Sequence, residues 1–424
     1  MRKFFVCAGL AVAGTTGLHA AYAPDLNTME ASKLWSVSGT LRGFYDDNYN
    51  TAPSGPFKRD SFGFEFSPSL SLNVPLQQTE IGARATYGLY YYQDRMSQGG
   101  RPIDQTGQMD LWLDHAFTER WQAKVQDSLA IGQEPELINQ GVPYRVSGDN
   151  LHNTGIATLD TQWTRLMGTE LSYQNNIYHY SSNPNQGLLD LIQHDIALNV
   201  NWRLQPELLV FVGYQYEQIN YTGNEIIGVN AAPNVNYLSD SRDNRSHYGY
   251  VGAQYNPLDN VELDARAGIQ YVSYYNPPAG LPSTDSLSPY ANISATYTYL
   301  PGSYVQLGFT QTRNSTDIAA VSGNKVTLDQ ESSTVYGALN HQITPRITGN
   351  VVGKIQYSTF NQGALNNQPQ TWYSAGLNLA YAFNPHLSAE VGYNFDYLTT
   401  ATGGGQTALG YHRNRIYIGV TGTY

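Results

Sequence analysis

The sequence predicts an all-β fold: a transmembrane, antiparallel, up-and-down β-barrel of about 18 strands (16–18) in an outer membrane. Three observations predict it. Only 13% of the 424 residues are charged, although the mean hydropathy is negative at −0.40. Apolar and polar residues alternate along many segments, and short turns alternate with long loops. A wall with one lipid face and one wet face needs alternating side chains and few full charges.

The first 23 residues have the pattern of a secretory signal peptide. Arg2 and Lys3 precede an apolar core, and small residues follow it, so that Ala20 and Ala23 are both candidate cleavage positions. The core is shorter than the roughly 20 apolar residues of a membrane-spanning helix. We therefore expect three parts, which are a signal peptide at 1–23, a short periplasmic N-terminal segment at 24–34 and the barrel at 35–424.

Cleavage changes the charge and the cysteine count. Loss of Arg2 and Lys3 takes the formal charge from −11 to −13, and Cys7 is the only cysteine. A mature chain without cysteine has no disulfide and no thiolate metal site. An acidic chain also lacks the basic footprint of a nucleic-acid-binding protein. We expect no cofactor, no bound metal and no nucleic-acid partner.

The strand signal is an alternation with a period of two residues. In 261–271, Val261 and Leu263 share one face while Glu262 and Asp264 share the other. This pattern is typical of a strand with one apolar and one wet face. The expected strands lie near 35–50, 61–74, 79–95, 108–117, 121–134, 154–163, 168–182, 190–202, 207–222, 243–256, 260–276, 288–299, 303–317, 331–343, 347–361, 370–383, 387–399 and 412–424.

The connections sort by length. Short turns at 74–78, 205–207, 257–260, 300–303, 344–346 and 384–386 alternate with longer loops at 51–60, 96–107, 135–153, 223–242, 277–287, 318–330, 362–369 and 400–411. Outer-membrane barrels have short periplasmic turns and longer extracellular loops. An even strand number places both termini on the periplasmic side. Tyrosine clusters near loop-proximal strand ends predict an aromatic girdle.

The last strand has the features of an assembly signal. Ile416, Ile418, Val420 and Tyr424 share the apolar face, and Tyr424 ends the chain. A terminal aromatic residue after alternating apolar residues resembles the signal by which the barrel-assembly machinery recognises its clients. We expect that machinery and outer-membrane lipid as partners.

Two segments carry a family resemblance. WSVSGTLRGFYDDNYN at 35–50 and LDHAFTERWQAKVQDSLAIGQEPEL at 113–137, together with the hairpin rhythm, resemble the "putative β-barrel porin 2" outer-membrane proteins. The resemblance implies location and architecture. It implies no transported substrate and no catalytic residue.

Alternation places a set of charged residues on the polar, inward face, where they are candidates to line a channel: Arg42, Asp46, Glu65, Arg84, Lys124, Asp195, Glu262, Asp264, Arg266, Lys354, Glu390 and Asp396. Symmetric hairpins would set Arg42 level with Ser69 and Arg84, and would set Asp46 level with Glu65. This register predicts a layer of arginines and a layer of carboxylates. One interpretation is that they are ordinary lumen charges paired through water, and the other is that they form a charged layer that sets the field of the pore.

Asp127 does not fit the alternation. It falls on the lipid face beside Val125 and Leu129. A β-bulge that shifts the register is one explanation, and a contact between copies in a homo-oligomer is the other.

An open pore for passive diffusion of small hydrophilic solutes is the function that these features favour, because barrels of this width leave an aqueous channel. The alternatives are an export component for a surface polysaccharide and a structural or adhesive surface barrel with an occluded lumen. The nine histidines form no zinc or catalytic spacing, so we expect no enzyme activity.

Overall fold

The computed structural model describes residues 33–97, 100–132, 149–181, 186–231, 234–278 and 283–424. The predicted signal peptide and its cleavage positions lie outside the described residues, as does segment 24–34 up to residue 32. Among the residues described, no helix has the length and apolar character to cross a membrane.

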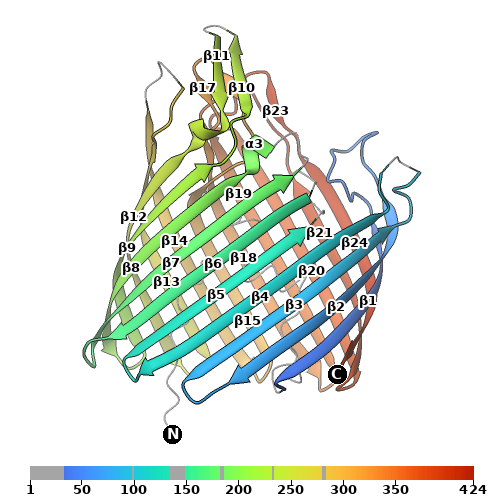
Figure 1. Cartoon of the computed structure of the whole chain (residues 1–424), viewed down its shortest axis with the longest axis vertical. Coiled ribbons are helices and arrows are strands. Elements are labelled where there is room, and N and C mark those ends of the chain that lie inside the picture. Colours follow the sequence, from blue (N-terminus) through green and yellow to red (C-terminus); the bar gives the residue numbers. More distant parts are fainter. Residues whose placement is uncertain (1–32, 98–99, 133–148, 182–185, 232–233, 279–282) are drawn as a thin grey trace.

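The architecture is a closed barrel, because 18 strands form one antiparallel sheet in which the last strand pairs with the first. Figure 1 shows the strands crossing the wall at a steep tilt. The predicted class and strand number are confirmed. The strands are β1 (Trp35–Asp46), β2 (Ser61–Pro75), β3 (Thr79–Tyr92), β4 (Ile103–Thr118), β5 (Trp121–Gly132), β6 (Asp149–Gln162), β7 (Met167–Ser181), β8 (Leu191–Gln205), β9 (Leu208–Tyr221), β12 (Asn244–Leu258), β13 (Val261–Tyr274), β14 (Thr284–Leu300), β15 (Ser303–Asn314), β18 (Asp329–Thr344), β19 (Ile347–Asn361), β20 (Pro369–Asn384), β21 (Leu387–Leu398) and β24 (Tyr411–Thr423).

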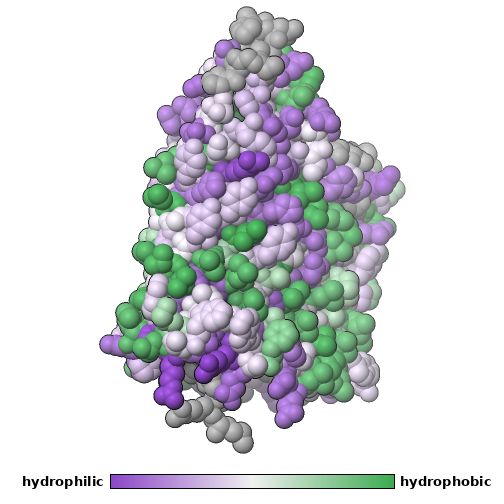
Figure 2. Space-filling view, turned by 60° about the vertical axis from the view of Figure 1, so that its left-hand side comes forward, coloured by the Kyte–Doolittle hydropathy of each residue, from purple (hydrophilic) through white to green (hydrophobic). Residues whose placement is uncertain are grey.

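Alternation decides which side chains face out. In β2, Phe62, Phe64 and Phe66 are 51–60% exposed, whereas Gly63 and Glu65 between them are buried. A similar division recurs along β21 and β24. A one-residue slip in the register would carry the apolar set to the wet side. Figure 2 shows green and pale side chains over the lower part of one face and purple ones gathering toward the loop-bearing end.

Three predicted loops contain structure that alternation did not reveal. Loop 223–242 folds into the hairpin of β10 (Ile226–Ala231) and β11 (Asn234–Leu238) followed by η1 (Ser239–Arg242). Loop 318–330 contains β16 (Val321–Ser322) and β17 (Lys325–Val326), and loop 400–411 contains β22 (Ala401–Gly403) and β23 (Gln406–Ala408). A short helix, α3 (Gln186–Leu189), precedes β8. Several strand bounds also differ. The first strand ends at Asp46 instead of 50, the fourth begins at Ile103 instead of 108, and the sixth begins at Asp149 instead of 154.

These loops pack together into a cap above one side of the barrel (Figure 1). Tyr237, Val326 and Leu328 bury one apolar cluster with residues of β13. Arg242 is fully buried, and its guanidinium donates to the backbone oxygens of Leu328 at 3.2 Å and Thr316 at 2.5 Å. A buried guanidinium needs such acceptors. Arg242 therefore fastens the cap to distant parts of the chain.

The tyrosine girdle is only partly as predicted. Tyr91, Tyr393 and Tyr397 face outward and are 36–42% exposed. Tyr92 and Tyr274, with the pair at 178 and 180, are buried instead. Tyr91 and Tyr92 are adjacent and so point in opposite directions, whereas the residues at 178 and 180 share one direction and both point inward.

Candidate functional site: the charged inner wall

Arg42 lies at the centre of an ion-pair group on β1, β2 and β21. Its Nη1 is 3.1 Å from Glu65 Oε1 and its Nε is 2.6 Å from Glu390 Oε1. Gly419 on β24 makes room for it, because a Cβ there would lie 2.6 Å from Arg42 Cγ. The Arg42 guanidinium also stacks on Tyr417, 5.2 Å from the ring centre. One arginine thus serves two carboxylates across the closing seam of the barrel.

The predicted register of the charged layers is wrong. Arg42 pairs with Glu65 rather than with Ser69, and Asp46 pairs with Ser61. Arg84 pairs with Ser71, so it lies several residues away from Arg42 along the wall. The hairpins are asymmetric because the first strand ends at Asp46 and leaves a longer loop before Ser61. Opposite charges consequently meet at one level instead of separating into two.

Asp46 belongs to a buried cluster at the loop-bearing rim. It is 0% exposed and lies between two arginines of β24, 2.5 Å from Arg413 Nη2 and 3.0 Å from Arg415 Nε. Arg415 also donates to the Tyr92 hydroxyl at 3.1 Å. This geometry makes Asp46 the counter-ion that permits both arginines to be buried. We call the wall of β1, β2, β3, β21 and β24 the seam wall.

On the opposite wall, formed by β7, β8, β9 and β12, two carboxylates are direct neighbours. Asp195 pairs with Glu217 across β8 and β9. The Gln193 amide nitrogen is 3.0 Å from Asp195 Oδ2 and 3.0 Å from Glu217 Oε2, so one amide bridges both groups. The Tyr248 hydroxyl donates to Glu217 at 3.3 Å. Neutral donors, and not arginines, hold this acidic pair.

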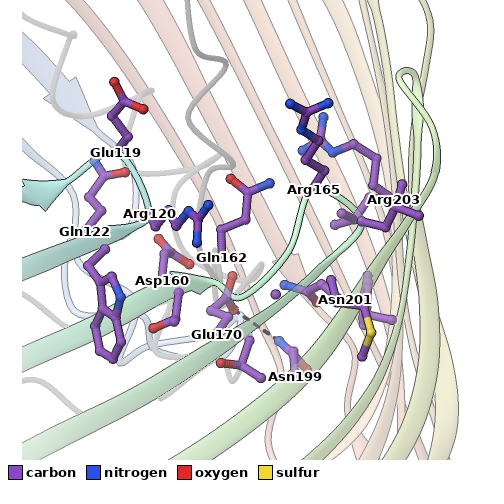
Figure 3. A pocket seen from close by; sticks show the side chains of 18 of the residues that line it. Glu119, Arg120, Gln122, Asp160, Gln162, Arg165, Glu170, Asn199, Asn201 and Arg203 are labelled. Carbon is purple, nitrogen blue, oxygen red and sulfur yellow. Dashed lines mark hydrogen bonds between the residues drawn. The ribbon is translucent and has the colours of Figure 1, made fainter.

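Below that pair, a pocket of about 520 Å³ opens at the turn-bearing end of the inner wall. Figure 3 shows Arg120, Asp160 and Gln162 pointing toward one another in it. Lys124 Nζ is 3.8 Å from Asp160 Oδ2, and Asn199 donates to Glu170 at 3.1 Å. Both signs of charge therefore line the same pocket, as suits polar solutes.

The remaining predicted residues also lie on the inward face. Arg266 Nη2 is 3.5 Å from Asp264 Oδ1, and Glu262 is exposed near the turn end. Lys354 is buried with its Nζ 4.3 Å from the Trp372 ring centre. Asp396 lies directly opposite Arg413 in the register. Arg84 Nε is 3.4 Å from Ser69 Oγ.

Some charged groups of the inner wall were missed. Glu217, Arg413 and Arg415 occupy inward positions that alternation within their strands would have identified. Arg242 carries no such signal, because it lies in a loop and its acceptors are backbone oxygens of distant segments.

The end of the chain is arranged as the alternation predicts. Ile416, Ile418 and Val420 are 46–67% exposed on the outer face, and Tyr424 is 68% exposed with its ring 6.0 Å from that of Trp35. Thr421 faces inward, where its hydroxyl is 2.9 Å from that of Thr40. The role of this row in assembly remains a prediction.

Comparison with known proteins identifies a matching family and solved structures with a similar fold. The family described as "Putative beta-barrel porin 2" matches residues 36–424. No curated protein sequence matches the chain. Among solved structures, OccK9 (OpdG) of Pseudomonas aeruginosa is 12% identical with a TM-score of 0.45, covering 92% of this chain and 98% of that one. The outer membrane protein opdK of Pseudomonas aeruginosa is 11% identical with a TM-score of 0.44, covering 92% and 99%. The FrpB iron transporter of Neisseria meningitidis is 9% identical with a TM-score of 0.44, covering 92% and 81%.

Proposed function

This chain belongs to the outer-membrane family described as "Putative beta-barrel porin 2", and from that premise we propose that it is a channel for passive diffusion of small hydrophilic solutes. Export by a cleaved signal peptide, and insertion by the barrel-assembly machinery through the row ending at Tyr424, belong to the same proposal. Contact with outer-membrane lipid follows from the apolar outer face, because side chains exposed there have no other apolar surroundings.

The inner wall is the observation that carries the proposal. A closed barrel of 18 strands is in the size range in which barrels leave an aqueous channel. Its inward positions hold ion pairs and amides, such as Arg42 with Glu65 and Asn199 with Glu170. Polar groups of both signs solvate ions and sugars without binding one of them tightly, as diffusion requires.

We infer a weak preference for cations. The chain without its leader carries a formal charge of −13, obtained from −11 by removing Arg2 and Lys3. Asp195 and Glu217 are adjacent carboxyl groups that neutral donors hold, and as close like charges they contribute one negative charge rather than two. Carboxylates on a channel wall attract cations and repel anions.

Single-channel recording of the refolded protein in planar bilayers tests the function. We expect stepwise ohmic conductance in potassium chloride and a reversal potential of cationic sign in a salt gradient. Liposome swelling with sugars of increasing size then measures the solute limit. A folded barrel that conducts no ions and passes no sugar would contradict the proposal.

The cap favours a second candidate, a structural or adhesive surface barrel with a covered mouth. Arg242 and the apolar clusters give the long loops a fixed structure of their own. Deleting the β10–β11 hairpin separates the two functions. Conductance that appears only after this deletion would support a covered barrel, and conductance in both proteins supports the pore. Polysaccharide export remains the third alternative, and Tyr248 and Tyr250 do not favour it, because both rings are 3% exposed.

A further inference from the structure

Asp127 faces the lipid without any β-bulge to explain it. The register of β5 with β6 is unbroken from Trp121 to Gly132, and the one irregularity with β4 lies near Thr118. Asp127 pairs with Leu111, whose side chain is 39% exposed on the outer face. The bulge explanation is therefore wrong, and a carboxylate stands on the membrane face.

The carboxylate belongs to a polar patch. Asn153 on β6 donates to both of its oxygens, at 3.1 and 3.2 Å, and within the described part of the chain these are its side-chain hydrogen bonds. On the next two strands, the Asn175 amide nitrogen is 3.1 Å from His194 Nδ1, and the Tyr173 hydroxyl is 2.9 Å from the same nitrogen. We call these five residues the outer polar patch.

The patch lies deep in the wall. Asp127 follows Trp121, the first residue of β5, by six residues, and Tyr173 follows Met167, the first residue of β7, by six. Both residues therefore lie at similar heights above the turn-bearing end, near the middle of the tilted strands. Lipid tails offer no hydrogen-bond donor at that depth. The phosphates of surface lipids lie higher and would repel Asp127.

From this geometry we propose that the outer polar patch is the contact surface of a homodimer, in which a second copy of this chain docks β6 against β6 about a twofold axis. A twofold axis along the membrane normal beside β6 places Asp127 of one copy opposite Tyr173 of the other, because the two flank β6 at equal height. The Tyr173 hydroxyl then exchanges its contact with His194 Nδ1, to which Asn175 still donates, for a bond to the carboxylate, twice in each dimer.

Small residues on β6 allow the approach. Gly155 lies between Asp127 and Asn175 in the register, and Ala157 lies between Val125 and Tyr173. A Cβ on Gly155 would lie 3.3 Å from Asp127 Oδ2, so the carboxylate rests over the bare backbone. Small side chains let two walls come close enough for polar contacts inside a membrane.

The choice of a dimer over a larger ring follows from the patch itself. A ring needs a second, different surface that complements the patch. On the patch, the acceptor Asp127 and the donor Tyr173 flank β6 six residues from the turn-bearing end. A twofold axis therefore satisfies both carboxylates with one surface, and a second surface such as that around Tyr393 on β21 is not needed.

Single cysteines test the proposal, because the chain without its leader contains no other. Ala157→Cys in outer membranes is expected to form disulfide-linked dimers on mild oxidation. Ala375→Cys, outward on the far strand β20, is the matched control and is expected to stay monomeric. Absence of a dimer from Ala157→Cys, or equal dimer from both variants, would overturn the contact.

Two substitutions test the chemistry without a cysteine. Asp127→Leu and Tyr173→Phe each remove one charged hydrogen bond per half-interface, so the dissociation constant measured by native mass spectrometry is expected to rise at least roughly tenfold. Tyr87→Phe, outward on β3, is the control. The heat stability of the barrel should not fall in either variant. A monomeric or trimeric wild type would contradict the proposal, and channel conductance would be unaffected by that outcome.

Discussion

The seam wall and the opposite wall handle carboxylates in different ways. On the seam wall, Asp46 and Glu65 lie against arginines that neutralise them. On the opposite wall, Asp195 and Glu217 are neighbours held by amide and hydroxyl groups. A buried ion pair holds its two strands in one arrangement, because separating the partners would leave an uncompensated buried charge. Carboxylates without cations leave a net field for mobile ions. The difference predicts that the seam wall fixes the closure of the barrel and that the opposite wall sets the field that a solute meets.

The largest effect should come from a charge on the outer face of the seam wall. Ile418→Asp places a carboxylate among lipid tails on β24, the closing strand, where such a charge costs up to a few kcal/mol. We expect assembled protein in outer membranes to drop severely, as it should when Tyr424 is deleted. Thr421→Ala, inward on the same strand, should assemble normally.

Val212→Asp on the opposite wall is the matched control. Val212 is 52% exposed on the outer face and Ile418 is 67% exposed, so both variants place a charge in lipid, but only Ile418 lies on the strand that closes the barrel. Ile418→Asp should impair assembly more than Val212→Asp. Equal impairment, measured by heat-modifiable mobility on gels, would show that the seam has no special role.

A smaller but clear loss should follow Asp46→Ala. The change leaves Arg413 and Arg415 buried without their shared counter-ion, which typically costs about 3–5 kcal/mol. The free energy of unfolding in urea, measured by tryptophan fluorescence in detergent, gives the value. The double variant Asp195→Asn with Glu217→Gln is the contrasting test, because no arginine is stranded. A similar loss of stability in both proteins would erase the distinction between the walls.

Ion selectivity should depend more on the carboxyl groups of the opposite wall than on those of the seam wall. Replacing Asp195 and Glu217 by their amides is expected to lower the cation-to-anion permeability ratio by roughly twofold. Arg42→Ser should raise this ratio, because Glu65 and Glu390 lose their cation. Reversal potentials in a salt gradient measure both. If neither variant moves the reversal potential while conductance persists, these residues lie outside the conducting path.

The smallest expected effect is a loosening of the seam rim in acid. Burial tends to raise the pKa of Asp47, but hydrogen bonds from Asn414 and Lys58 outweigh it, and the pKa is lowered. A lowered carboxyl pKa stabilises the fold fully above the unfolded value of about 4, and this contribution is lost as the pH falls through the folded pKa. Hydrogen exchange in 47–60 should therefore rise below about pH 4. Asp47→Asn should show no such rise.

Alternation predicts the wall of this barrel well and its details poorly. The period of two residues places Glu65, Asp195 and Lys354 on the inward face, because direction is a local property of a strand. It cannot give the partner of Arg42, since a shift of a few residues in one hairpin exchanges Ser69 for Glu65. Register depends on loop length and turn geometry, which the alternating pattern does not encode. The cap was missed because Arg242 finds its partners through the backbone, where residue types carry no signal.

The contacts of Arg242 also bear on the order in which the barrel and its cap fold. Its acceptors at Leu188, Thr316 and Leu328 lie 54, 74 and 86 residues away along the chain. Bringing such remote segments together in an open chain is opposed by loop-closure entropy, whereas the finished barrel already holds them side by side. We therefore expect the cap to be the last part to become ordered. Protection of its amides against exchange, or of its backbone against an added protease, would serve as a clock for the completion of folding in the membrane.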